Sequence, residues 1–352
     1  MGCIKNWLGI IIQKIRLSKK RMDVRAFFIM DGGIFIRTLY IIGNGFDIAH
    51  ELDTRYWKFR EYLEEVDPYF LRMFEGLYNI QPLDDTEPWY TQEAQERWNK
   101  TVNNDLWSAF EDKMGRPNTT EMVEQSECVT EGMPLVNIRD HMDIYWKEQF
   151  GFVSKLQSYV KEWIETVDTD CVECKRKALI DSNDIFLNFN YTDVLEKVYG
   201  IEDVLHIHGG VSSVCDIPPI MGHCNKRDIQ QHRLWAKEAD EVYSEAEASV
   251  LDAVADYLED IYKDTRERIF LNQYFFERLQ SVNHVVVIGW SAGDVDIPYL
   301  QEVISKVDKS TTWTVYWYDD IAYNSLQKAF KKEGITDKKK IHYIQSSEFW
   351  DK

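Results

Sequence analysis

The segment Leu39-Tyr-Ile-Ile-Gly-Asn-Gly-Phe-Asp47 is the part of this chain that best indicates its fold class. Its apolar residues run directly into the turn Gly43-Asn44-Gly45, and a helical pattern follows. This order is typical of a buried strand that leads into a tight turn, whose backbone N–H groups can contact a phosphate. The turn alone has low specificity, because Ile48 or Ala49 stands where the third glycine of a dinucleotide-binding motif would be.

Further strands are expected along the chain, separated from one another by helical sequence. They cover residues 184–188, 204–208, 284–289, 312–318 and 340–344. Alternation of strands and helices predicts an α/β fold with a Rossmann-like, mainly parallel sheet. In such a sheet ligands bind at the carboxyl ends of the strands. The polar turns at residues 43–47, 190–193, 208–210 and 289–294 are therefore expected to form one nucleotide site.

Three regions are predicted from composition and periodicity. Residues 1–36 form a basic N-terminal extension, residues 37–66 and 180–352 the Rossmann-like nucleotide-binding domain, and residues 67–179 a helical insertion. One helix is expected over residues 46–65, and residues 231–279 read as helical and acidic. The polar stretch 117–137, inside the insertion, is expected to be a long loop.

The formal charge of −19, from 41 Lys and Arg against 60 Asp and Glu, disfavours nucleic-acid binding. No run reaches the roughly 18 apolar residues that a membrane span requires, so stable membrane insertion is not expected. The first 30 residues are basic, with Asp23 as their single acid. They are interpreted as the product of an upstream start codon, with Met22 or Met30 as the true initiator; a segment that touches a membrane surface is the alternative.

Six cysteines in a chain of 352 residues do not make a secreted disulfide scaffold, which favours a cytoplasmic protein. Cys171 and Cys174 have Cys-x-x-Cys spacing, and Cys215, His223 and Cys224 could complete a zinc site. The spacing of these partners is irregular, so thiols without a metal are the preferred interpretation and no metal is predicted.

The combined motifs resemble those of the AbiH family, bacterial proteins of abortive phage infection. The motifs that carry the resemblance are Ile42-Gly-Asn-Gly-Phe-Asp47, Leu106-Trp-Ser-Ala-Phe-Glu111, Phe189-Asn-Tyr-Thr-Asp193, His206-Ile-His-Gly209 and Ile288-Gly-Trp-Ser-Ala-Gly-Asp-Val-Asp296. The resemblance covers about residues 38–345 and implies an antiphage protein that responds to a phage-derived trigger.

More distantly, the motifs are similar to those of sirtuin-like domains that consume NAD. This similarity implies NAD as substrate or ligand, with His208, Asn190 and Asp193 as catalytic residues. The residues expected to bind the cofactor are Gly43, Asn44, Gly45, Phe46, Asp47, Tyr191, Gly209, Gly289, Ser291 and Asp294. Thr192 departs from the sirtuin-like motif, which has an aspartate at this position.

The chemistry of NAD cleavage suits these residue types. Breaking the bond between nicotinamide and ribose passes through a cation-like sugar, which nearby carboxylates can stabilise. A histidine can accept a proton near pH 7, which is the role expected of His208. Asn190 cannot titrate, so it is expected to position a ribose hydroxyl or the attacking water. Carboxylates beside the phosphates would, however, oppose binding.

Each candidate residue also has an ordinary structural interpretation. Asn190 could cap the following helix, and Asp47 could stabilise the first turn of a helix. His208 could be a buried histidine of the core. Trp107 and Glu111 are four residues apart and are expected to pack within the helical insertion.

Three functions are consistent with these residues. The preferred one is an antiphage protein that binds NAD or a related nucleotide and hydrolyses NAD at the nicotinamide–ribose bond. The alternative is a non-catalytic nucleotide sensor or partner-binding module of a phage-defence system. A nuclease ranks last, because the sequence shows no basic path for nucleic acid. The sequence does not determine the oligomeric state, and it is compatible with a homo-oligomer.

Overall fold

A computed structural model describes residues 37–84, 86–87, 90–131, 137–175, 184–211, 215 and 217–350. Six strands form one parallel sheet in the order β3-β2-β1-β4-β5-β6, the order of the Rossmann fold. The strands are β1 (Thr38–Ile42), β2 (Ile185–Asn188), β3 (Val204–His206), β4 (His284–Ile288), β5 (Thr312–Trp317) and β6 (Ile341–Gln345). The predicted α/β fold is thus confirmed. The predicted N-terminal extension lies outside the described residues.

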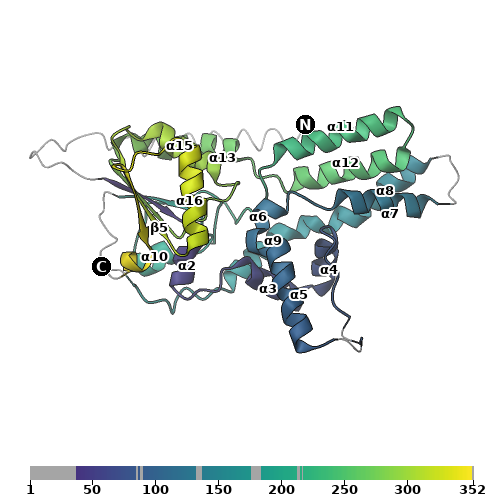
Figure 1. Ribbon diagram of the computed structural model, residues 1–352, viewed down its shortest axis with the longest axis horizontal. Helices are drawn as coiled ribbons and strands as arrows, with labels where there is room; N and C mark the ends of the chain where they lie inside the picture. Colours follow the sequence, from purple (N-terminus) through teal and green to yellow (C-terminus); the bar gives the residue numbers. More distant parts are fainter. Residues whose placement is uncertain are drawn as a thin grey trace, which may run out of the picture. The chain divides into compact units, whose positions relative to one another are not determined.

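Helices cover both faces of the sheet, as a buried parallel sheet requires (Figure 1). Successive residues of β1 and β4 alternate between two hydrophobic clusters, because side chains along a strand point to opposite faces. Leu39 and Val285 pack on one face, and Ile42 and Ile288 on the other. The helices around the sheet are α2 (Asn44–Ala49), α10 (Val194–Tyr199), α13 (Thr265–Leu271), α14 (Gln273–Arg278), α15 (Ile297–Lys306), α16 (Asp320–Lys332) and α17 (Ser347–Trp350), with the short 3-10 helix η3 (Leu279–Ser281).

The remaining helices enclose a separate hydrophobic cluster, whose centre includes Phe59, Trp107 and Phe110. They are α3 (Tyr56–Val66), α4 (Pro68–Gly76), α5 (Gln92–Asp105), α6 (Phe110–Lys113), α7 (Thr119–Thr130), α8 (Ile138–Phe150), α9 (Leu156–Glu165), α11 (Lys226–Glu241) and α12 (Glu245–Asp260), with the 3-10 helices η1 (Trp107–Ala109) and η2 (Gly151–Lys155). Helices α11 and α12 lie side by side, next to α7 and α8 (Figure 1). The helical cluster thus includes sequence on both sides of β2 and β3.

Two local predictions are wrong. The stretch 117–137 is not one long loop, because α7 occupies Thr119–Thr130 and packs against α12. Asn118 caps this helix by accepting a hydrogen bond from the backbone N–H of Glu121 at 3.3 Å, and Met122 is buried. The helix expected over residues 46–65 is divided into α2 and α3, which are joined by a non-helical segment that begins with a turn.

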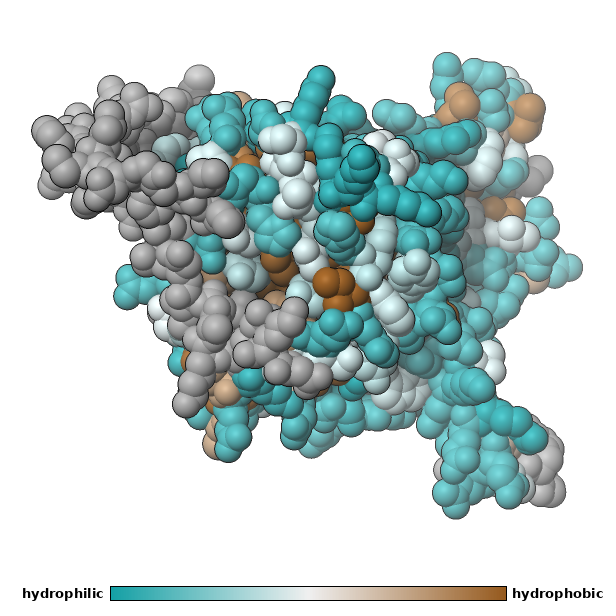
Figure 2. Space-filling view, turned by 60° about the vertical axis from the view of Figure 1, so that its left-hand side comes forward, coloured by the Kyte–Doolittle hydropathy of each residue, from teal (hydrophilic) through white to brown (hydrophobic). Residues whose placement is uncertain are grey.

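The face of the molecule in Figure 2 is dominated by hydrophilic residues, and its hydrophobic residues occupy small, separate areas. None of the helices in the described part of the chain combines the length and the hydropathy that crossing a bilayer requires.

Candidate functional site

A cavity of about 1220 Å³ lies at the carboxyl edge of the sheet. The turns that follow β1, β2, β3 and β4 all contribute to its lining, together with residues at the start of α3 and from η1 and α6. The structure thus brings together most of the predicted site residues: Gly43, Asn44, Gly45, Asp47, Asn190, Tyr191, His208, Gly289, Ser291 and Asp294.

The glycine turn packs against the turn that follows β4. Gly43 N–H donates to the Ile288 carbonyl at 3.1 Å, and Gly45 N–H donates to the Gly289 carbonyl at 2.8 Å. A Cβ on Gly45 would lie 2.7 Å from the Gly289 Cα, and Gly289 itself has a φ of +68°. The two glycines of the first turn therefore permit close contact between two turns, and their N–H groups are already paired.

The Asn44 side chain holds the segment that joins α2 to α3. Its Nδ2 donates to the Thr54 carbonyl at 2.9 Å, and its Oδ1 accepts from the Thr54 hydroxyl at 2.5 Å. Arg55 follows directly and lines the cavity. Asn44 thus fixes a neighbouring segment of the cavity wall.

Asp47 and Asn190 are bonded to each other in the wall of the cavity. Asn190 Nδ2 donates to Asp47 Oδ1 at 2.8 Å and to the Gly43 carbonyl at 3.2 Å. The Thr192 hydroxyl donates to the other Asp47 oxygen at 2.7 Å. Burial raises the pKa of Asp47 to about 7, although these two hydrogen bonds oppose the shift. Asn190 therefore connects the turns after β1 and β2 and is not a helix cap.

His208 and Asp296 form a buried pair at the cavity wall. His208 is 3% exposed, and its Nε2 lies 3.5 Å from Asp296 Oδ1. Neither of these atoms has a hydrogen-bond partner within the described structure. Burial, with Lys263 and Arg268 nearby, holds the pKa of His208 well below its ordinary value.

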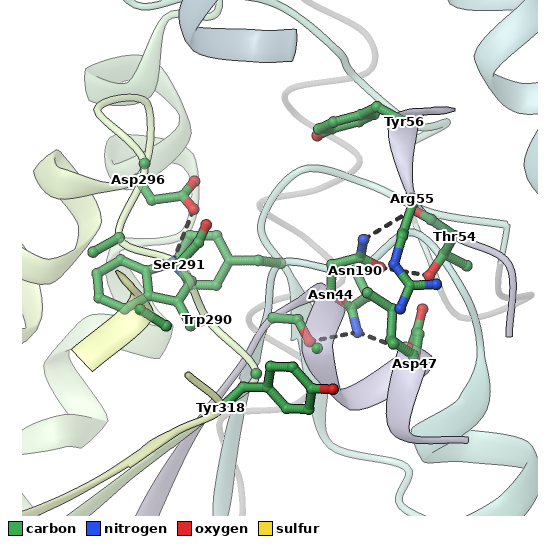
Figure 3. Close-up of a pocket in the computed structure, with 18 of the residues that line it drawn as sticks. Asn44, Asp47, Thr54, Arg55, Tyr56, Asn190, Trp290, Ser291, Asp296 and Tyr318 are labelled. Carbon is green, nitrogen blue, oxygen red and sulfur yellow. Dashed lines mark hydrogen bonds between the residues drawn. The ribbon is translucent and has the colours of Figure 1, made fainter. Parts of the chain in front are cut away.

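The pKa of Asp296, the carboxyl group of this pair, is shifted in the opposite direction, upwards. Burial and the neighbouring Glu111 raise the pKa of Asp296 to about 8. Its second oxygen accepts a hydrogen bond from Trp290 Nε1 at 2.8 Å (Figure 3). At neutral pH the pair is therefore a neutral imidazole facing a protonated carboxyl, and it can exchange a proton with a hydroxyl group in the cavity.

The helical part contributes a second charged pair. Glu111, at the start of α6, lines the cavity and binds the buried Lys263. Glu111 Oε1 also accepts from the Tyr191 hydroxyl and from the Gly222 N–H, both at 3.4 Å. The sequence prediction that Glu111 packs within the helical insertion misses its place in the cavity lining. Trp107 also borders the cavity, but its side chain is fully buried and its Nε1 donates to Glu75.

Three predicted residues do not line the cavity. Phe46 is buried against His50, Tyr199 and Trp350. Asp193 accepts from the Thr169 hydroxyl at 2.7 Å and pairs with Lys197 at 3.3 Å. Gly209 has a φ of +74° and packs closely against the Pro218 carbonyl.

The charge of the cavity lining is mostly negative. Among the described lining residues, Arg55 is the one arginine or lysine, whereas five residues carry carboxyl groups: Asp47, Glu111, Asp112, Asp294 and Asp296. Desolvation and the neighbouring Asp294 raise the pKa of Asp112. Aromatic side chains, among them Trp57, Trp290 and Tyr318, also line the cavity and could stack on a planar ring.

The described residues contain no group of three or more His, Cys, Asp or Glu side chains arranged to hold a metal ion. Cys171 and Cys174 are exposed, and His223 Nε2 is bonded to the Leu258 carbonyl at 2.9 Å.

Comparison with known families adds to this geometry. Residues 39–317 match the family described as Bacteriophage abortive infection AbiH. The chain belongs to the AbiH family. Membership implies a role in abortive infection of bacteriophage, and the matched residues run from β1 through β5 and so include the turns after β1, β2, β3 and β4 that line the cavity. Neither the curated proteins nor the solved structures gave a match.

Four charged residues of the described cavity lining in this AbiH protein are not among the predicted site residues: Arg55, Glu111, Asp112 and Asp296. Glu111 and Asp296 stand in two of the motifs that carry the family resemblance. Their place in these motifs is the sequence feature from which they could have been predicted as site residues. Lys263 lies outside every quoted motif, and its pairing with a residue 152 positions away has no sequence signal.

Proposed function

We propose that this AbiH-family protein binds NAD or a related nucleotide and hydrolyses NAD at the nicotinamide–ribose bond. The observation that carries the proposal is the His208–Asp296 pair, in which two buried polar atoms without partners face each other at the cavity wall. The pair lies at the carboxyl edge of a Rossmann-order sheet, where nucleotides bind in folds of this kind.

The proposed reaction follows from the residues around this pair. The bond between ribose C1′ and the nicotinamide nitrogen breaks, and nicotinamide leaves as a neutral molecule with the bonding electrons. A water molecule adds to C1′, and its proton passes to His208 Nε2 and then to solvent. Glu111, Asp112 and Asp294 supply negative charge that stabilises the cation-like sugar. The products are nicotinamide, ADP-ribose and a proton.

The alternative is a nucleotide sensor without turnover. It is favoured by one observation: the Asn190 amide group and the glycine-turn N–H groups bond to other protein groups. A sensor would be stabilised by its ligand without releasing nicotinamide.

Hydrolysis would act in defence by depleting NAD in an infected cell. Such an activity must be silent in healthy cells, so we propose a phage-derived trigger. A cytoplasmic location fits this role and stays a prediction, as does assembly into a homo-oligomer.

The test is incubation of the purified protein with NAD, followed by chromatography for nicotinamide and ADP-ribose. We expect His208→Ala to lower the rate about 10²- to 10⁴-fold, which is the usual contribution of a general base. The matched control is His284→Ala, because His284 is half-buried at the opposite end of β4 and bonds to Thr312. Unchanged nicotinamide release by His208→Ala would contradict the proposed role of His208.

A further inference from the structure

Arg55 differs from every other residue in the wall of the cavity. Its side chain is exposed, it carries the one positive charge among the described arginines and lysines that line the cavity, and it forms no ion pair with any described residue. Its neighbour Lys58, one turn further along α3, is paired with Glu61 at 2.9 Å. An unpaired guanidinium in an acidic cavity is suited to binding an anionic group of a ligand.

The glycine turn is less suited than Arg55 to bind the anionic group of a ligand. The N–H groups of Gly43, Gly45 and Phe46 donate to carbonyl groups of the protein at 2.8–3.1 Å. Helix α2, which follows the turn, has only 6 residues, so few aligned peptide dipoles reinforce its N-terminus. At these three N–H groups, a phosphate contact would have to replace existing hydrogen bonds.

The position of Arg55 is fixed by the segment before it. The two hydrogen bonds between Asn44 and Thr54 tie this segment to the glycine turn. Figure 3 shows Arg55 on the same side of the cavity as Asn44 and Thr54, with Asp296 on the opposite side. One side of the cavity thus includes the His208–Asp296 pair, and the other carries Arg55 together with Asp47, whose carboxyl group already accepts hydrogen bonds from Asn190 and Thr192.

We infer that Arg55 binds the phosphate groups of the ligand, an inference that rests on the proposed function. The planar guanidinium can form two parallel hydrogen bonds to phosphate oxygens. Glu111 and Asp112 lie close enough to Asp296 to raise its pKa, and Asp294 acts in the same way on Asp112, so these carboxylates repel phosphates from the Asp296 side. The ligand is therefore oriented with its phosphates at Arg55 and the ribose that carries nicotinamide at His208. Asn44 is a positioning residue for this contact.

The test is calorimetric titration at constant ionic strength with ADP-ribose, and with adenosine as a ligand that lacks phosphates. We expect Arg55→Gln to weaken ADP-ribose binding about 10- to 100-fold, the usual cost of losing hydrogen bonds to a charged group. Adenosine binding should not change. Arg55→Lys keeps the charge and should recover part of the affinity, and Lys58→Gln is the matched control.

Equal ADP-ribose affinities of the wild type and Arg55→Gln would overturn the inference. So would an equal loss of adenosine binding in this variant, or a wild type that binds neither ligand. Nicotinamide release from NAD is measured separately on the same samples. If the wild type binds ADP-ribose but releases no nicotinamide, the proposed hydrolysis fails, while the variants still decide the role of Arg55.

Discussion

Two buried ion pairs in the helical part of the molecule illustrate opposite uses of the same chemistry. In the first pair, Arg60 and Glu75 are each 4% exposed and are joined by two hydrogen bonds of 2.8 and 3.3 Å. Glu75 also accepts from Trp107 Nε1 at 2.8 Å, and the Arg60 guanidinium lies 5.0 Å from the centre of the Trp57 ring. Surrounding groups thus enclose this pair.

The second pair, Lys263 and Glu111, is asymmetric. Lys263 is 2% exposed and does not line the cavity, whereas Glu111 forms part of the cavity wall. The contacts from Lys263, Tyr191 and Gly222 all end on Glu111 Oε1. Burial of an ion pair therefore does not define its role. A fully enclosed pair contributes to the helical core, whereas a pair with one partner in the cavity wall places a negative charge where a ligand can meet it.

The largest expected difference is in stability. Glu75→Ala removes the buried counter-charge of the Arg60 guanidinium and leaves it only the exposed Glu64, 3.0 Å from its Nη1, so we expect the free energy of unfolding to fall by about 3–5 kcal/mol. Glu111→Ala should cost less, because water in the cavity can enter and because a lysine, unlike an arginine, can lose its proton. Urea denaturation of both variants measures the difference. Equal losses would mean that both pairs are structural.

The sheet and the edge where the cavity lies can be predicted because they depend on local patterns. Short apolar runs such as 39–42 and 285–288 end in polar or glycine-rich turns, and parallel strands bring those turns to one edge. The position of Asp193 close to Asn190 predicts that it belongs to the site, but its carboxylate bonds to Thr169 and Lys197. Closeness in sequence does not fix the direction of a side chain in an irregular turn.

Other features have no local pattern. Helix α7 is not predicted because its sequence is polar; the helix is stabilised by the Asn118 cap and by packing on α12. The contact between Lys263 and Glu111 joins two segments 152 residues apart. The hydrogen bonds of the Gly43 and Gly45 N–H groups to protein carbonyls cannot be predicted from the sequence either. Glycine turns that pack on protein and glycine turns that bind phosphate have similar sequences.

Gly45 and Gly76 offer a second comparison between an enclosed position and an open one. Gly45→Ala would place a Cβ 2.7 Å from the Gly289 Cα, and because the atoms it would meet are backbone, we expect a loss of about 1–3 kcal/mol. Gly76 ends α4, and a Cβ added there would meet no atom within 4 Å, so Gly76→Ala should stabilise the helix by about 0.4–1 kcal/mol. Thermal unfolding of the two variants checks both signs. If Gly76→Ala also destabilises the protein, the space beside Gly76 does not accommodate a methyl group.

The finest difference to resolve is that between two buried aspartates at the sheet edge. Asp47 is enclosed by bonds from Asn190 and Thr192, and its pKa is about 7. Asp296 accepts one bond from Trp290, has an unpartnered oxygen and has a pKa of about 8. In both cases burial is the largest cause of the rise from the ordinary value of 3.8.

The pH dependence of unfolding separates these two groups. A raised pKa means that the folded protein keeps a proton that the unfolded chain has lost, so stability falls as pH rises, by at most about 1.4 kcal/mol per unit for each group. For Asp47 this fall ends near pH 7, and for Asp296 near pH 8. The stability of Asp296→Asn relative to the wild type should therefore keep rising between pH 7 and 8, whereas that of Asp47→Asn should level off. Urea denaturation at half-unit steps from pH 5 to 9 measures both curves. If the two curves level off at the same pH, the open position of Asp296 does not distinguish it from Asp47.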